Sequence, residues 1–108
     1  MSFDPMGLAI DWLDAYRRQS LADVLELYAG SAAIECGCTG SSIIVGKGAI
    51  AAYWIDRFKA QPATCLVDIQ PQGNAVMLTY KAVEKSVNAV LHFDAYARIR
   101  LQTCGPDK

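Results

Sequence analysis

The chain has 108 residues, of which 53% are apolar and 19% charged, and its formal net charge at pH 7 is -1. This length and balance predict one globular domain over residues 1–108, because two hydrophobic cores would need a longer chain. No basic segment or charge excess indicates binding to phosphates, so we expect no nucleic-acid partner.

The N-terminal segment "MSFDPMGLAIDW" lacks the cationic start and long apolar run of a secretory signal. No uncharged apolar stretch approaches the roughly 20 residues that a membrane span requires, so we expect no membrane partner. These features predict a cytoplasmic protein whose four cysteines are reduced thiols.

Two short motifs raise the question of a metal or cofactor. Cys36 and Cys38 in "ECGCTG" have the proximity of a metal clip, but no second cysteine or histidine pair lies nearby. The lone "GKG" at residues 46–48 lacks the longer spacing and the terminal Lys-Ser or Lys-Thr of a phosphate-binding loop. We therefore expect neither a metal nor a cofactor.

Three helices are predicted in the first 62 residues. The first covers residues 4–19, with Asp4 as N-cap and Pro5 in the first turn. The second covers 20–30, where Ser20 begins the helix and Gly30 ends it. The third begins after Gly48 and stops before Pro62.

Strands dominate the rest. A brief strand is predicted at 32–37, followed by a loop rich in glycine, serine and threonine. Apolar and β-branched runs at 64–72, 74–83 and 86–102 are separated by short polar turns, which is typical of an antiparallel meander. Helices followed by strands indicate an α+β fold with the helices on one sheet face.

The segments "AYRRQSLADVLELYA", "AAIE", "GKGAIAAYW" and "HFDAYARIR", in this order, resemble the SnoaL-like group of the nuclear transport factor 2-like superfamily. The resemblance implies a cone-like roll, in which a curved antiparallel sheet wraps the helices and leaves a pocket at one end. It also implies a homodimer formed through the outer sheet face. Members include ketosteroid isomerases, polyketide cyclases and binding proteins without catalysis, so fold alone does not choose a function.

Ketosteroid isomerases place a carboxylate base, a tyrosine and a protonated aspartic acid around an apolar cavity. By resemblance, Asp94 falls at the aspartic acid position. The base position falls at Cys36, with Glu35 beside it, and the tyrosine position falls at Trp12, with Tyr16 one turn later. Two of three positions do not match, so steroid isomerisation is not expected.

If residues 90–100 formed one strand, His92, Asp94 and Tyr96 would share a face, opposite the apolar row that contains Phe93 and Ile99. Two orientations are open: the apolar row packs under the helices, or Asp94 points into the cone. The neighbouring strand 74–83 is apolar on both faces, which favours the inward Asp94 and a partner subunit outside. Burial would then raise the pKa of Asp94, and His92 would complete an acid/base pair.

The sequence therefore predicts a pocket for a small apolar organic ligand and leaves open whether the protein is an enzyme. Chemistry would be a cofactor-independent isomerisation, cyclisation or hydration, with Asp94, His92, Glu35 and Tyr16 as catalytic residues. The alternative is a binding or dimeric association module whose cone is filled by its own side chains. The expected ligand-binding residues are Trp12, Cys36, Tyr53, Trp54, Tyr80 and Tyr96.

Two further expectations concern surface features. Asp56, Arg57 and Lys59 are interpreted as a solvated face of the third helix. The C-terminal "TCGPDK" is interpreted as a turn that no strand follows, which would leave the pocket mouth more open than usual.

Overall fold

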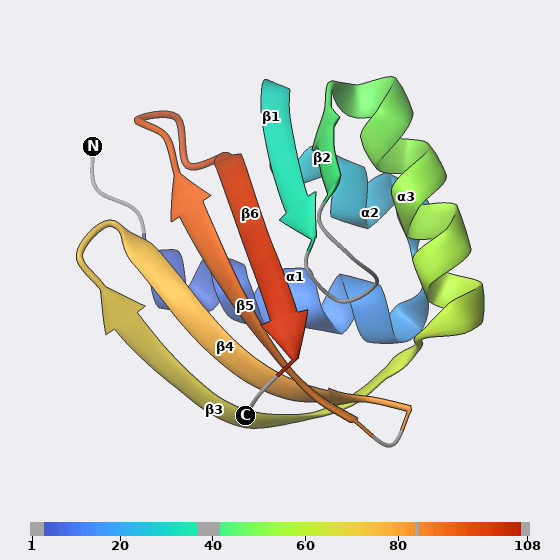
Figure 1. The fold of residues 1–108 in the computed structure, drawn as a ribbon. Coiled ribbons are helices and arrows are strands. Elements are labelled where there is room, and N and C mark those ends of the chain that lie inside the picture. The colour runs from blue at the N-terminus through green and yellow to red at the C-terminus, as the bar shows by residue number, and fades with distance from the viewer. Residues whose placement is uncertain (1–3, 37–41, 84, 107–108) are drawn as a thin grey trace.

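The computed structural model describes residues 4–36, 42–83 and 85–106. In these ranges the chain forms three helices and six strands in one sheet (Figure 1). The helices are α1 (Pro5–Arg18), α2 (Leu21–Glu26) and α3 (Lys47–Ala60). The strands are β1 (Tyr28–Cys36), β2 (Ser42–Val45), β3 (Ala63–Gln72), β4 (Ala75–Ala82), β5 (Lys85–Phe93) and β6 (Ile99–Pro106).

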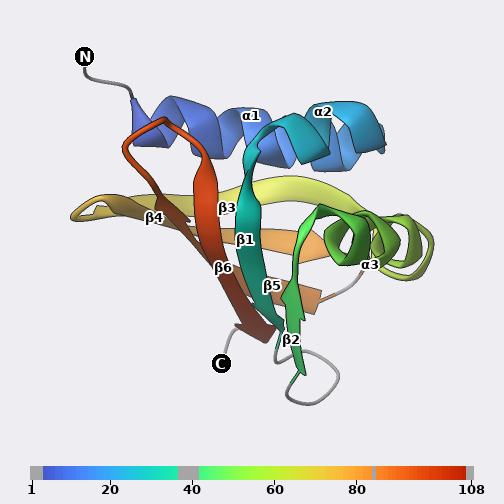
Figure 2. The same ribbon diagram turned by 90° about the horizontal axis from the view of Figure 1, so that it is seen from above.

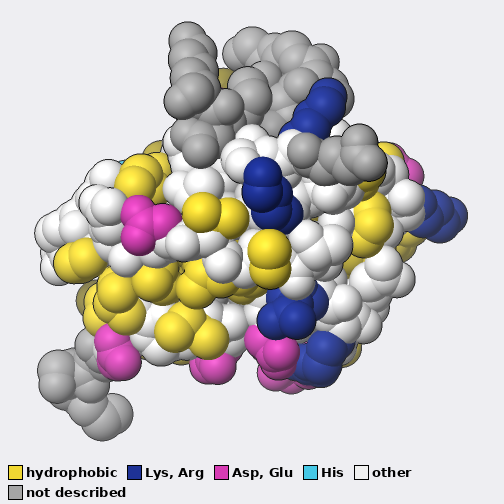
Figure 3. All heavy atoms as spheres, turned by 90° about the horizontal axis from the view of Figure 1, so that it is seen from below, with side chains coloured by type: hydrophobic (Ala, Val, Ile, Leu, Met, Phe, Trp, Pro, Cys, Tyr) yellow, Lys and Arg dark blue, Asp and Glu magenta, His cyan; other side chains and the backbone are white. Residues whose placement is uncertain are grey.

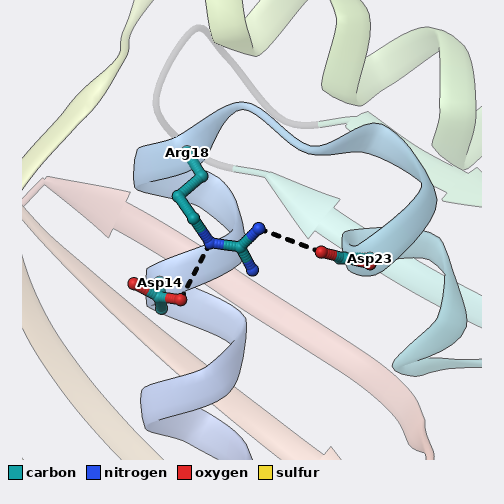
Figure 4. A network of polar contacts seen from close by, with 3 residues as sticks. All are labelled: Asp14, Arg18 and Asp23. Atoms are coloured by element: carbon teal, nitrogen blue, oxygen red, sulfur yellow. Dashed lines mark hydrogen bonds and ion pairs between the residues drawn. The ribbon is translucent and has the colours of Figure 1, made fainter.

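The first helix begins and ends as its sequence predicts. The Asp4 carboxylate accepts a hydrogen bond from the Met6 backbone N–H at 3.1 Å, and Pro5 occupies the first turn. At the other end Arg18 joins α1 to the start of α2 (Figure 4). Its Nε donates to Asp14 at 2.9 Å and its Nη1 to Asp23 at 3.0 Å.

The second helix is shorter than predicted. It ends at Glu26 instead of Gly30, because Tyr28 already belongs to β1 and is fully buried there. The Ile99 backbone N–H donates to Leu27 O at 2.7 Å and Tyr28 pairs with Ile99, so pairing with β6 competes with helix continuation. The predicted loop after β1 is also partly wrong, since residues 42–45 form β2; Cys38 lies outside the described residues.

The sheet has the order β2-β1-β6-β5-β4-β3. Strands β3 to β6 form an antiparallel meander as predicted, but the strand expected over residues 86–102 is divided into β5 and β6. Strand β1 pairs antiparallel with β2. The sheet is nevertheless mixed and not purely antiparallel, because β1 runs parallel to β6. The C-terminal prediction is wrong as well: Thr103 to Pro106 extend β6 and do not form a turn.

Helices α1 and α2 lie on one side of the curved sheet, and α3 lies beside them next to β2 (Figure 2). This α+β arrangement agrees with the predicted fold class. Side chains of β4 that face the helices, such as Leu78 and Tyr80, are fully buried. We call this helix-facing side the inner face, and the opposite side the outer face.

The far edge of the sheet is formed by β3, most of whose residues are exposed. Hydrophobic side chains gather on this side of the molecule, with acidic and basic side chains along its border (Figure 3). Ile10 of α1 and Leu66 of β3 are 50% and 39% exposed and line the same shallow groove. Pro71 removes one backbone donor from this edge strand, which makes edge-to-edge pairing less favourable.

Candidate functional site

The predicted row of His92, Asp94 and Tyr96 does not exist, because β5 ends at Phe93. Asp94 instead holds the turn between β5 and β6. Its Oδ1 accepts hydrogen bonds from the backbone N–H groups of Tyr96 at 2.8 Å and Arg98 at 3.0 Å. Ala97 adopts a left-handed φ of 63° within this turn. A short carboxylate side chain favours such a turn over an extended strand.

The orientation expected for this segment is also wrong. Leu91 pairs with Val76 of β4, and both are fully buried on the inner face. Phe93 and Ile99 pair with each other and are 6% and 0% exposed. The apolar row therefore packs beneath the helices, because burial of these side chains stabilises the fold more than burial of His92 or a carboxylate would.

The other predicted acid/base residues lie outside the interior. His92 pairs with Leu101 and Glu35 pairs with Thr103, both on the outer face, and Glu35 is exposed. Partial burial lowers the pKa of His92, and the positive charge of Arg100 lowers it further. The sheet separates these groups from Tyr16, so the four proposed catalytic residues do not converge.

The inner face is filled by aromatic side chains. Trp12, Tyr16, Trp54 and Tyr80 are each 0% exposed and meet edge to face, with ring centroids 4.8 to 5.8 Å apart. The predicted ligand walls thus converge, but as packed core. Tyr96 does not join this core, being 85% exposed in the β5–β6 turn. Cys36 is the last residue of β1, and its side chain lies outside the described part of the structure.

A second buried aromatic group carries its own polar chain. Tyr28 accepts a hydrogen bond from the Trp12 indole nitrogen at 3.0 Å and donates to the Gln102 side chain. Burial raises the pKa of Tyr28 above its ordinary range. The side chains of Trp12, Tyr28 and Gln102 thus satisfy one another's hydrogen-bonding groups, which is typical of a structural network.

Arg57 is the residue that the sequence interpretation missed. It is 6% exposed and does not belong to a solvated face. Its Nε donates to the Tyr16 hydroxyl at 3.0 Å and its Nη2 to the Tyr80 hydroxyl at 3.1 Å. The guanidinium carbon lies 5.9 Å from the ring centroids of both Tyr16 and Tyr53. The signal was available: Arg57 lies three residues after Trp54 and seven after Ile50, on the same helical face.

The tyrosines around Arg57 remain neutral. Burial raises the pKa values of Tyr16 and Tyr80, and the nearby positive charge of Arg57 opposes that rise without cancelling it. Burial acts to lower the pKa of Arg57, but interactions with the surrounding tyrosine oxygens raise it by more. The pKa of Arg57 is therefore above its ordinary value, and the guanidinium stays charged. The Tyr16 hydroxyl in turn donates to the Gln61 carbonyl oxygen.

A groove opens beside this cluster, between α3 and β2, with a cavity volume of about 450 Å³. We call it the α3 groove. Its apolar wall comprises Ile44, Ala49, Ala52, Tyr53 and Ala60, and its polar end comprises Asp56, Arg57 and Gln61. Tyr53 also approaches the sheet, since its hydroxyl lies 3.8 Å from the Cys104 sulfur of β6. Of the predicted ligand residues whose side chains the structure describes, Tyr53 is the one that lines the groove.

Comparison with known proteins gives a fold and no activity. No family model matches the chain, and no curated protein matches it. A solved structure from Burkholderia thailandensis, described as a SnoaL-like protein of unknown function, superposes with a TM-score of 0.83. The two share 17% sequence identity over 96% of this chain and 95% of that one. The fold of this protein is SnoaL-like.

Within this SnoaL-like fold, the described residues offer hydrogen-bond donors but no assembled acid/base centre. No group of three or more histidine, cysteine, aspartate or glutamate side chains in the described ranges is placed to hold a metal ion. No helix among them is both long and apolar enough to cross a membrane. The α3 groove, whose polar residues include the buried cation Arg57 and the phenol of Tyr53, is suited to binding an oxygen-bearing group of a small molecule.

Proposed function

We propose that this protein binds a small, largely apolar organic molecule in the α3 groove. The observation that carries the proposal is the groove itself, a cavity of about 450 Å³ beside a cone interior otherwise packed with aromatic rings. Pockets for small organic ligands commonly measure roughly 300–1,000 Å³ and combine apolar walls with a few polar groups. The α3 groove has both properties.

Binding without turnover is the better supported form of this function. Three of the four residues proposed for acid/base chemistry, His92, Glu35 and Asp94, lie on the outer face or in the β5–β6 turn, away from the groove, and Tyr16 is buried in the aromatic core. Asp56 is the carboxylate among the groove residues, and it is exposed to solvent. A general base works best when it is shielded from water beside its substrate, so an exposed Asp56 is poorly placed for proton transfer next to a carbonyl.

A bulky substitution in the groove wall tests the proposal. We expect Ala52→Trp to fill the space between α3 and β2 and to abolish the thermal stabilisation produced by compounds that bind the wild type. The screen contains ketones, lactones, terpenoids and apolar carboxylic acids. Amide chemical shifts then locate the bound compound.

The matched control is Ala22→Trp, which places the same ring on an exposed position of α2. It should bind like the wild type. Equal binding by the Ala52→Trp variant would place the ligand elsewhere and overturn the proposal, as would the absence of any binding across the screen.

We also infer that two copies associate through the outer sheet face. Ile43 and Val45 of β2 lie on this face and are 68% and 62% exposed. Val45 continues through Ala33 into Leu101 along one cross-strand row. Ala33 and Leu101 are half-buried and Val45 is exposed, so this apolar row favours burial against a partner, and a second copy supplies the same surface.

A further inference from the structure

The positive charge of Arg57 has no negative partner among the described residues. The ion pairs among the described residues join Arg18 to Asp14 and Asp23. None of the described carboxylates lies within 4.0 Å of the Arg57 guanidinium. Its hydrogen-bond partners are the hydroxyls of Tyr16 and Tyr80, which are neutral. A charge that is 6% exposed and lacks a counter-ion is costly, so the site favours a bound anion.

The guanidinium also has hydrogen-bonding capacity beyond the two tyrosines. Arg57 lines the α3 groove, and its two hydrogen bonds use two of the five N–H groups that a guanidinium carries. A planar guanidinium matches the two oxygens of a carboxylate, and such charge-assisted hydrogen bonds are stronger than neutral ones. Tyr53 stacks near the guanidinium and extends the apolar wall from this point.

We propose that the α3 groove selects an apolar monocarboxylic acid, whose carboxylate binds Arg57 and whose body lies along Ile44, Ala49 and Ala52. This inference rests on the proposed function and specifies its ligand class. A single negative charge fits best, because Arg57 is the one cation among the groove residues and Asp56 would repel a dianion. The alanines keep the wall open to a bulky ring or chain.

A pair of isosteric probes tests the charge requirement on the wild-type protein. The probes are 2-naphthylacetic acid and its primary amide, titrated at concentrations up to the order of millimolar, where weak binding is measurable by calorimetry. We expect the acid to bind about tenfold more tightly than the amide or better, because its hydrogen bonds to Arg57 are charge-assisted. Added salt should weaken the binding of the acid more than that of the amide.

Variants of the cation complete the test. Arg57→Met should remove the preference for the acid while the amide still binds, and Arg57→Lys should retain part of the preference, since it keeps charge but loses the planar fork. The control Lys59→Gln removes an exposed charge from the same helix and should leave both affinities unchanged. Folding of each variant is checked by its cooperative thermal transition.

The outcomes separate the two proposals. Equal affinity of the wild type for acid and amide would overturn the carboxylate inference and leave groove binding intact. A preference for the acid that survives in Arg57→Met would also overturn it. If neither probe binds and the wider screen is negative too, the proposed function itself fails.

Discussion

At the scale of single residues, His92 gives the fold a pH dependence. Its pKa lies below the ordinary value of about 6.5 because of partial burial and the nearby Arg100, whereas the unfolded chain restores the ordinary value. The unfolded state therefore binds the proton more readily, and the contribution of neutral His92 to stability is present above about pH 6.5 and lost as pH falls through the lower folded pKa.

We expect the substitution His92→Gln to remove this loss. Urea unfolding at steps between about pH 7 and pH 5 should give a flatter dependence of the free energy of unfolding for the variant than for the wild type. Identical slopes for the two proteins in this interval would show that His92 does not titrate differently on folding.

The location of a residue, though not its role, was predictable where spacing carries the signal. Trp12, Tyr16 and Trp54 were expected around one interior, and they meet there. Asp94 was misplaced because "FDAYAR" contains no glycine or proline and has the composition of a strand. The turn depends on two backbone hydrogen bonds to the Asp94 carboxylate, which no periodicity reveals.

At the scale of elements, the β4–β5 connection contains a strained residue. Val83 has a φ of 59°, a left-handed conformation that β-branched residues disfavour, and it is 54% exposed. We expect Val83→Asn to raise the free energy of unfolding by about 0.5–1 kcal/mol, because asparagine tolerates this conformation. The measurement is urea unfolding.

The control for this prediction is Val67→Asn, which makes the same exchange at an exposed position within β3. Val67 does not have a positive φ, so no left-handed strain is relieved and stability should stay level or fall slightly. A gain of the same size in both variants would attribute the effect to surface polarity and contradict the conformational explanation.

Elements with strong local signals were predicted correctly. The first helix has its cap, its proline and its apolar stripe, and the meander has alternating strands with short turns. Three of the four residues of β2 are β-branched, but a segment this short beside a glycine- and serine-rich stretch shows no periodic pattern. The end of α2 depends on the hydrogen bond between Leu27 and Ile99, which lie 72 positions apart in the sequence. Local helix propensity cannot anticipate such a distant contact.

At the scale of the whole molecule, the outer sheet face determines the proposed association. We expect the wild type to migrate as a dimer and Val45→Glu to migrate as a monomer, because a buried unpaired carboxylate is costly in an interface. Size-exclusion chromatography with light scattering measures both masses.

The matched control is Ile55→Glu, which alters a residue of α3 that is 43% exposed. It should remain dimeric. A monomeric wild type, or a Val45→Glu variant that stays dimeric, would contradict association through the outer face.

The parallel pairing of β1 with β6 brings together distant parts of the chain, which is why the sequence did not predict a mixed sheet.

The close packing of Trp12 against Trp54 has an optical consequence. These are the two tryptophans of the chain, and their ring centroids lie 5.7 Å apart in a core that excludes water. Intrinsic fluorescence of the native protein should accordingly be emitted at short wavelength and shift to the red on denaturation. Since Trp54 and Arg57 lie in the same helix, the same emission offers a label-free signal of ligand binding in the α3 groove.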